Sequence, residues 1–299
     1  MTAEQPESSS DEIVQDELLC TRLENGIRVP RLAMWNICSK SISRDIDKCF
    51  VSGYRHIMLS SGAERDQEVG ESMQRWIQKS RPGHCRDELF ISFMFDLGPV
   101  IGLGSAQQQQ QKLNNRLQAL ECHHIDMLIL YKGDNVKIGD NLRQRNAITS
   151  LWKAFEKLVN EGMIRCLSLA NFCQDEVESL TANCTIQPSV LWLSNDPNKM
   201  GWKDVDHFYR YCQYKEFIPG VMHRVDRPEA EWVRGHGSSL GNVSRELQKT
   251  PLQVFHRLLV QKNFIVAVAG DIKTMENGFQ VFDFCLKEDH INELKAIRL

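Results

Sequence analysis

The sequence predicts an α/β protein built as a single (β/α)8 TIM barrel, and three observations carry that prediction. Short apolar segments alternate with amphipathic ones along most of the chain, as expected when each parallel strand is followed by a helix. Eight such apolar segments occur, and 299 residues suit the roughly 250 that a barrel of this kind needs. Some segments, such as 125–130, are almost wholly apolar, which is typical of strands covered on both faces.

The expected elements follow from these patterns in chain order. Apolar residues recur at the helical period over 147–161, at Ile148, Leu151, Trp152, Phe155 and Leu158. We expect strands near 31–35, 54–59, 89–94, 125–131, 163–169, 189–194, 217–222 and 264–269. We expect helices near 43–51, 65–79, 106–121, 147–161, 174–182, 202–215, 250–262 and 287–297.

The chain divides into a tail, residues 1–17, and a barrel domain, residues 18–299. The tail contains six acidic residues and no Lys or Arg, a composition that predicts a disordered acidic segment. Residues 18–30 predict an N-terminal β-hairpin, with Asn25 and Gly26 as the central residues of a type I′ turn.

Composition argues against several classes of function. A formal net charge of −3 gives no reason to expect nucleic acid or an anionic membrane as a partner. No apolar stretch reaches the length of a membrane span, and no secretory signal pattern begins the sequence, so we expect a cytoplasmic protein. The ten cysteines form no Cys-x-x-Cys pair. His123 and His124 are neighbours on a strand and point to opposite faces, so a site that includes Asp126 would need a further ligand, and no metal site is expected.

Seven groups of residues carry a family resemblance. They are Leu23-Glu24-Asn25-Gly26, Gly53-Tyr54-Arg55-His56-Ile57 followed by Val69-Gly70, Glu88-Leu89-Phe90-Ile91, His124-Ile125-Asp126, the segment Trp152–Arg165, the pair Asn171-Phe172, and Val281-Phe282-Asp283-Phe284. In their order and spacing these pieces resemble the aldo-keto reductases. The resemblance implies a (β/α)8 barrel whose bottom is plugged by the hairpin, and NADPH-dependent reduction of carbonyl groups.

The family's four catalytic roles fall on residues of other types here. In the family a Tyr donates a proton to the carbonyl oxygen, a Lys paired with an Asp lowers the Tyr pKa, and a His orients the substrate. The matching positions hold Met58 for Asp, Ala63 for Tyr, Met94 for Lys and Tyr131 for His. Three of these side chains have no titratable proton, so Tyr131 is the one remaining proton donor, and a space-filling role is favoured for it.

The positions that hold the cofactor in the family are also altered. Asn171 remains from the pair that binds the nicotinamide carboxamide, and Lys273 is a candidate for the Arg that contacts the 2′-phosphate. The nearby Asp271 would repel a phosphate. The other family positions are occupied by Ala170, Trp192 and Met222.

These losses leave two functions open. The first is a catalytically inactive homologue that acts by binding, in a regulatory or scaffold role. Its target is a protein partner, as in the regulatory subunit of glutamate–cysteine ligase, or a small apolar ligand in the barrel mouth, and no cofactor is expected. The alternative is an NADP(H)-dependent oxidoreductase with residual or altered carbonyl reductase activity. The glycine-rich stretch 235–241 is expected to be a flexible connection.

Overall fold

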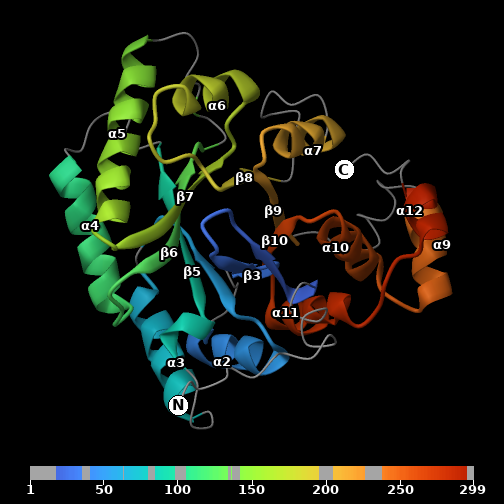
Figure 1. Cartoon of the computed structure of the whole chain (residues 1–299). Helices are drawn as coiled ribbons and strands as arrows, with labels where there is room; N and C mark the ends of the chain where they lie inside the picture. Colours follow the sequence, from blue (N-terminus) through green and yellow to red (C-terminus); the bar gives the residue numbers. More distant parts are fainter. Residues whose placement is uncertain are drawn as a thin grey trace, which may run out of the picture.

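A closed barrel of eight parallel strands forms the centre of the molecule (Figure 1). The computed structural model describes residues 18–35, 41–62, 64–79, 85–97, 106–133, 136, 142–194, 205–225 and 238–294, so the predicted tail and Ala63 lie outside the described residues. The strands are β3 (Leu32–Trp35), β4 (His56–Leu59), β5 (Phe90–Asp96), β6 (Ile125–Tyr131), β7 (Ile164–Ala170), β8 (Val190–Leu193), β9 (Ile218–Arg224) and β10 (Ile265–Ala269). They pair in chain order, and β10 closes the barrel against β3, which confirms the predicted fold.

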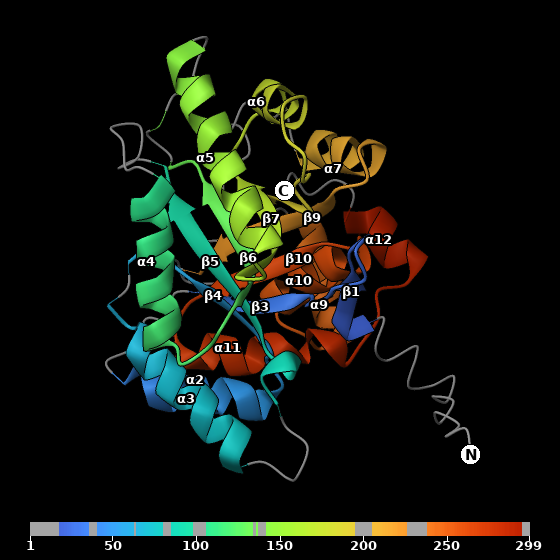
Figure 2. The same ribbon diagram turned by 60° about the vertical axis from the view of Figure 1, so that its left-hand side comes forward.

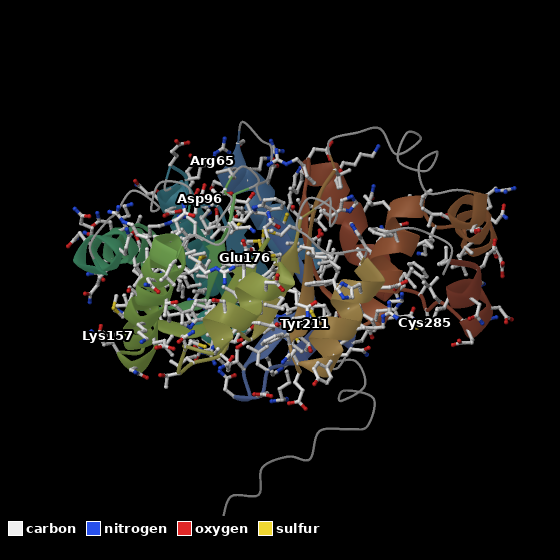
Figure 3. The ribbon with its side chains drawn as sticks, turned by 90° about the horizontal axis from the view of Figure 1, so that it is seen from above. Arg65, Asp96, Lys157, Glu176, Tyr211 and Cys285 are labelled. Carbon is white, nitrogen blue, oxygen red and sulfur yellow. The ribbon has the colours of Figure 1, made fainter. Side chains whose placement is uncertain are left out.

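Helices surround the barrel, and α2 and α3 lie side by side on its outside in both views (Figure 1 and Figure 2). Their bounds are α2 (Ile42–Ser52), α3 (Asp66–Lys79), α4 (Ala106–Ala119), α5 (Leu142–Asn160), α6 (Gln174–Thr181), α7 (Val205–Tyr214), α9 (Ser238–Leu247), α10 (Pro251–Gln261), α11 (Ile272–Gly278) and α12 (Glu288–Leu294), with 3-10 turns η1 (Arg86–Glu88) and η3 (Phe279–Phe282). Viewed from above, Lys157 on α5 and Cys285 before α12 mark opposite flanks of the molecule (Figure 3).

Three sequence-based expectations about helices need correction. Helix α5 begins at Leu142, five residues earlier than expected. Helix α11 was not predicted, because its seven residues are too few to show a helical period. Helix α9 begins at Ser238, so residues 238–241 form a helical turn and not the expected flexible connection.

The N-terminal hairpin pairs β1 (Cys20–Arg22) with β2 (Arg28–Pro30). Its turn is not type I′, because Gly26 alone has a positive φ (+81°) and Asn25 does not. The Gly26 N–H donates to the Leu23 carbonyl at 2.9 Å, and the Leu23 N–H donates to the Ile27 carbonyl at 2.9 Å. A three-residue loop with its glycine in the left-handed region therefore replaces the two-residue loop.

Strand alternation divides the buried side chains into two layers. Alternate residues of each strand face the surrounding helices and form the larger cluster, with Phe93 and Leu128 as examples. The residues between them face the barrel axis, where they meet Leu23, Ile27 and Val29 from the hairpin. The hairpin thus contributes to the barrel interior, as the resemblance implied.

Candidate functional site

Side chains from six strands meet in the barrel interior at the positions singled out in the sequence. Those that pack into one buried cluster are Met58 (β4), Met94 (β5), Ala170 (β7), Trp192 (β8) and Met222 (β9), with Tyr131 (β6) packed against them. None of the five buried residues is more than 4% exposed. The structure therefore brings together residues that are remote in the sequence, at the place where a barrel enzyme holds its reacting groups.

This cluster contains few groups that exchange protons. The thioethers of Met58 and Met94 have no proton to give, and burial raises the pKa of the Cys166 thiol. Tyr131 supplies the phenol of the cluster, and its register partner on β5 is Asp96. The nearest lysine in sequence, Lys132, does not supply the missing cation, because its Nζ pairs with the Glu176 carboxylate at 2.5 Å.

Trp192 is one of the largest fully buried side chains, and it packs in the cluster of the barrel interior. Its indole Nε1 donates to the Ser168 Oγ at 2.9 Å, and the ring is 1% exposed. The ring lies against the backbone of Gly220 on the neighbouring strand, where a Cβ would come within 2.5 Å of two indole atoms. The indole ring fits here because Gly220, its register partner on β9, has no side chain.

Asn171, the expected partner of a carboxamide, is used by the protein itself. It is fully buried, and its Oδ1 accepts a hydrogen bond from the Ser194 N–H at 3.0 Å. Its own N–H donates to the Trp192 carbonyl at 3.0 Å, and its φ is +65°, in the left-handed region that Asn tolerates better than most residues. These bonds join the ends of β7 and β8, a structural task for the amide.

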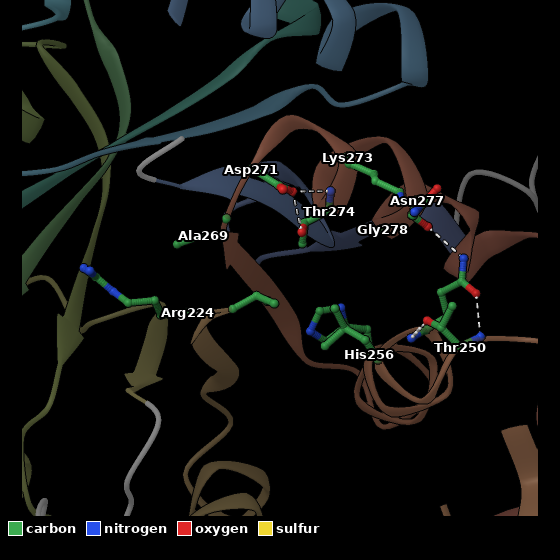
Figure 4. Close-up of a pocket in the computed structure, with 13 residues that line it drawn as sticks. Arg224, Thr250, His256, Ala269, Asp271, Lys273, Thr274, Asn277 and Gly278 are labelled. Atoms are coloured by element: carbon green, nitrogen blue, oxygen red, sulfur yellow. Dashed lines mark hydrogen bonds between the residues drawn. The ribbon is translucent and has the colours of Figure 1, made fainter. Parts of the chain in front are cut away.

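Lys273, the candidate phosphate contact, lines a cavity of about 540 Å³ between the ends of β9 and β10, α10 and α11 (Figure 4). Asp271 lies on the same cavity, as the sequence suggested, but it is also the N-cap of α11. Its carboxylate accepts from the Thr274 N–H at 2.8 Å and from the Thr274 hydroxyl at 2.7 Å, and these bonds hold its pKa below the usual range.

Sequence reasoning missed two residues of this cavity, Arg224 and His256. Arg224 is two residues after Met222 on β9, so the alternation of a strand places both on the face toward the mouth. Its guanidinium carbon lies 5.7 Å from the centre of the Trp35 ring, at the rim between the cavity and the barrel mouth. No sequence pattern pointed to His256, which enters from α10.

A second, smaller cavity of about 150 Å³ lies outside the barrel wall, between β4, α2 and α3. Met58 lines it together with apolar residues of α2, and Arg116 and Asp66 lie at its edge. That pair is held by two hydrogen bonds between the guanidinium and the carboxylate, at 2.5 and 2.6 Å. Among the residues that the structure describes, no cluster of metal-binding side chains and no helix of membrane-spanning length and apolarity occurs.

Comparisons with known proteins agree with the fold. A model described as the Aldo/keto reductase family matches residues 44–299. Aldo-keto reductase family 1 member A1 of Gallus gallus is 20% identical over 296 residues, which cover 92% of this chain and 87% of the relative. The NAD(P)H-dependent D-xylose reductase I,II of Candida tropicalis is 23% identical over 309 residues, covering 92% and 91%.

Solved structures are similar at the same low identity. The aldose reductase from Schistosoma japonicum superposes with a TM-score of 0.74 at 21% identity, over 92% of this chain and 90% of that chain. An aldo-keto reductase solved in complex with NADPH gives a TM-score of 0.72 at 19% identity, over 92% and 86%. At these identities the structural likeness shows the fold alone.

Proposed function

The chain belongs to the aldo-keto reductase family, and we propose that it is a member without carbonyl reductase activity that acts by binding, in a regulatory or scaffold role. The observation that carries the proposal is the packing of Met58, Met94 and Trp192 into one buried cluster. The Asp and Lys that support the general acid in the family are replaced there by the thioethers of Met58 and Met94, and the indole of Trp192 stands at a cofactor position. Loss of one positioned acid or base typically costs about 10²- to 10⁴-fold in rate, and here more than one is replaced.

The replacements also support each other energetically. A buried Asp–Lys pair that lost one member would leave an uncompensated charge in the barrel. Methionine at both Met58 and Met94 avoids that cost, because a flexible thioether fills irregular space without needing a partner. This pattern is expected of a barrel that is selected to fold and to bind but not to reduce a carbonyl.

The family's cofactor fits this chain poorly at its nicotinamide end. The amide of Asn171 is hydrogen-bonded to Ser194, the residue at the stacking position is Met222, and Trp192 fills the neighbouring space. We therefore propose that NADP(H) is not positioned for hydride transfer. The binding targets that we propose are a protein partner or a small apolar ligand in the barrel mouth, beside Met58, Met94, Trp192 and Met222.

An assay of NADPH and NADH oxidation with a panel of aldehydes and ketones tests the proposal. The Candida tropicalis D-xylose reductase serves as the positive control. We expect rates equal to those of the protein-free blank, both for the native protein and for Tyr131→Phe. Oxidation that depends on the protein and falls in Tyr131→Phe overturns the proposal in favour of the alternative, an oxidoreductase in which Tyr131 donates the proton.

A further inference from the structure

The cavity of about 150 Å³ lies outside the barrel, where strand β4 meets the helices α2 and α3 that pack side by side (Figure 1 and Figure 2). Its floor is apolar, and no side chain of the floor is more than 8% exposed: Met34, Ile42, Ile46, Ile57, Leu59 and Val69. Strand alternation turns Met34, Ile57 and Leu59 away from the barrel axis, so the floor belongs to the outer layer of the core. The cavity is therefore separate from the barrel mouth.

The buried charges at the cavity neutralise each other. The guanidinium of Arg116 donates from Nε and Nη2 to the carboxylate of Asp66, at 2.5 and 2.6 Å, and from Nη1 to the Ser60 carbonyl at 2.7 Å. The ring of Phe93 covers one face of the guanidinium, with its centre 3.9 Å from the central carbon. Since this ion pair is satisfied within the protein, it gives little attraction for a further charge. A ligand that fits the cavity is therefore uncharged.

The cavity opens to solvent between the end of β4 and the start of α3. Gly62, Glu64 and Arg65 line it there and are exposed. The opposite charges of Glu64 and Arg65 leave this entrance without a net charge. A Cβ added at Gly62 would meet nothing within 4 Å, so the space beside this residue is open. A small molecule can therefore reach the apolar floor without separation of α2 from α3.

The volume and the lining of the cavity determine the size and kind of ligand. In other proteins an apolar cavity of about 150 Å³, lined by aliphatic side chains, binds benzene in preference to water, because water finds no polar partners there. The floor of this cavity has the same character, since it consists of branched aliphatic side chains and one thioether. The sulfur of Met34 favours an aromatic ring over an alkane, because thioethers make favourable contacts with aromatic groups.

We propose that this cavity binds an uncharged aromatic molecule with a single ring of benzene size, held against Met34 and between Ile46 of α2 and Val69 of α3. This site goes beyond the proposed function, which concerns the barrel mouth. The two places lie on opposite sides of β4, and Met58 borders both of them. Occupancy of the cavity therefore requires neither a nicotinamide cofactor nor the absence of reductase activity.

NMR of the native protein with labelled methionine methyl groups tests the site during a titration with benzene. The methyl resonance of Met34 should shift and reach saturation, because the ring current of benzene acts on protons beside it. The methyl resonances of Met94 and Met222, in the barrel interior, should stay in place. That of Met73, which is buried on α3 but does not line the cavity, should also stay in place.

Ligands of matched shape test the chemical class. Benzoate and benzylamine carry a charge on the same ring, and each should bind at least about tenfold more weakly than benzene, because the charge would lose its water without gaining a partner. Naphthalene should also bind more weakly, since its second ring exceeds the space. Benzoate or benzylamine with an affinity equal to that of benzene overturns the assignment of an uncharged ligand.

A variant that fills the cavity tests its location. Val69→Leu adds one methylene group to the wall on α3 and should weaken the binding of benzene by about tenfold or more, because the ligand and the larger side chain compete for the same space. Val243→Leu makes the same change at a buried valine of α9 that does not line the cavity, and it should leave the affinity unchanged. The titration of the native protein decides the question even where a variant does not fold.

The outcomes separate this proposal from the proposed function. Absence of a saturable shift of Met34 up to the solubility limit of benzene, or an unchanged affinity in a folded Val69→Leu variant, overturns the cavity site and leaves the lack of reductase activity untouched. Saturable shifts of Met94 and Met222 with Met34 unmoved place the ligand in the barrel mouth and also overturn the cavity site. Protein-dependent oxidation of NADPH overturns the proposed function, whatever benzene does.

Discussion

The indole ring of Trp192 lies directly against the backbone of Gly220, its register partner on β9. A methyl group at Gly220 would lie 2.5 Å from two ring atoms and 3.0 Å from a third. The ring is also fixed by its bond to Ser168, so it cannot move without losing that bond. The absence of one side chain thus determines how the barrel interior is filled.

Substitution of Gly220 by Ala is therefore expected to destabilise the fold by overpacking. Such a change typically costs about 1–3 kcal/mol, because the indole must leave its position. Urea unfolding of Gly220→Ala measures the change, and Gly62→Ala is the matched control, since a Cβ there meets nothing within 4 Å. Equal stability of the two variants would show that the Trp192 ring is not held as described.

Reintroduction of charge at Met58 and Met94 tests whether the two positions act as a pair. Met58→Asp and Met94→Lys each bury an unpaired charge and should each lower the free energy of unfolding by about 3 kcal/mol or more. The double variant should lose less than the sum of the single variants, by at least about 0.5 kcal/mol, because the charges neutralise each other. Met58→Leu, a volume-conserving change, should cost under about 1.5 kcal/mol. Strictly additive losses would contradict the pairing.

His56 predicts a dependence of stability on pH. Burial lowers its pKa to about 4, from an ordinary value of 6.5. Between these values the unfolded chain binds a proton that the folded protein does not, so stability is highest above pH 6.5 and falls as the pH approaches 4, by roughly 3 kcal/mol. In His56→Gln the difference in the free energy of unfolding between pH 7 and pH 4 should be smaller by about this amount. The exposed His123→Gln should show the same difference as the native protein.

Variants of Asn171 distinguish a structural role of its side chain from a role in binding a carboxamide. Both Asn171→Gly and Asn171→Ala remove the bond to Ser194, but alanine must also adopt the positive φ. We expect both variants to unfold at lower denaturant concentration, with Ala less stable than Gly by about 1 kcal/mol. Thermal or urea unfolding in the absence of any ligand is sufficient, since the effect requires none. If both variants were as stable as the native protein, the bond between Asn171 and Ser194 would not stabilise the fold.

The sequence predicted the fold well because the strands carry a strong signal. All eight expected strands are present, and the expected residues Met58, Met94, Tyr131, Trp192 and Met222 do meet in the barrel. The alternation of side chains along each strand places these positions on the inner face of the barrel, so the prediction did not depend on side-chain conformations. The identity of the hairpin turn was predicted wrongly, since an Asn-Gly pair is compatible with more than one loop length.

The large cavity was beyond the reach of sequence reasoning for a physical reason. Its charged and polar residues come from three separate elements: Arg224 from β9, His256 from α10 and Lys273 from α11. Helix α11 is too short for periodicity to reveal, and Asp271 was interpreted as an acid that repels a phosphate and not as an N-cap. The pattern Asp271 followed by Thr274 at the third helical position was the available signal.

The emission of the reduced nicotinamide during titration of NADPH with the protein tests the central claim most directly. Our account predicts emission identical to that of free NADPH at every protein concentration, because Trp192 and Met222 occupy the space in which the nicotinamide ring would lie. Saturable enhancement of the nicotinamide emission would place that ring in a dry pocket beside Trp192 and Met222, and would contradict the account of a closed barrel interior.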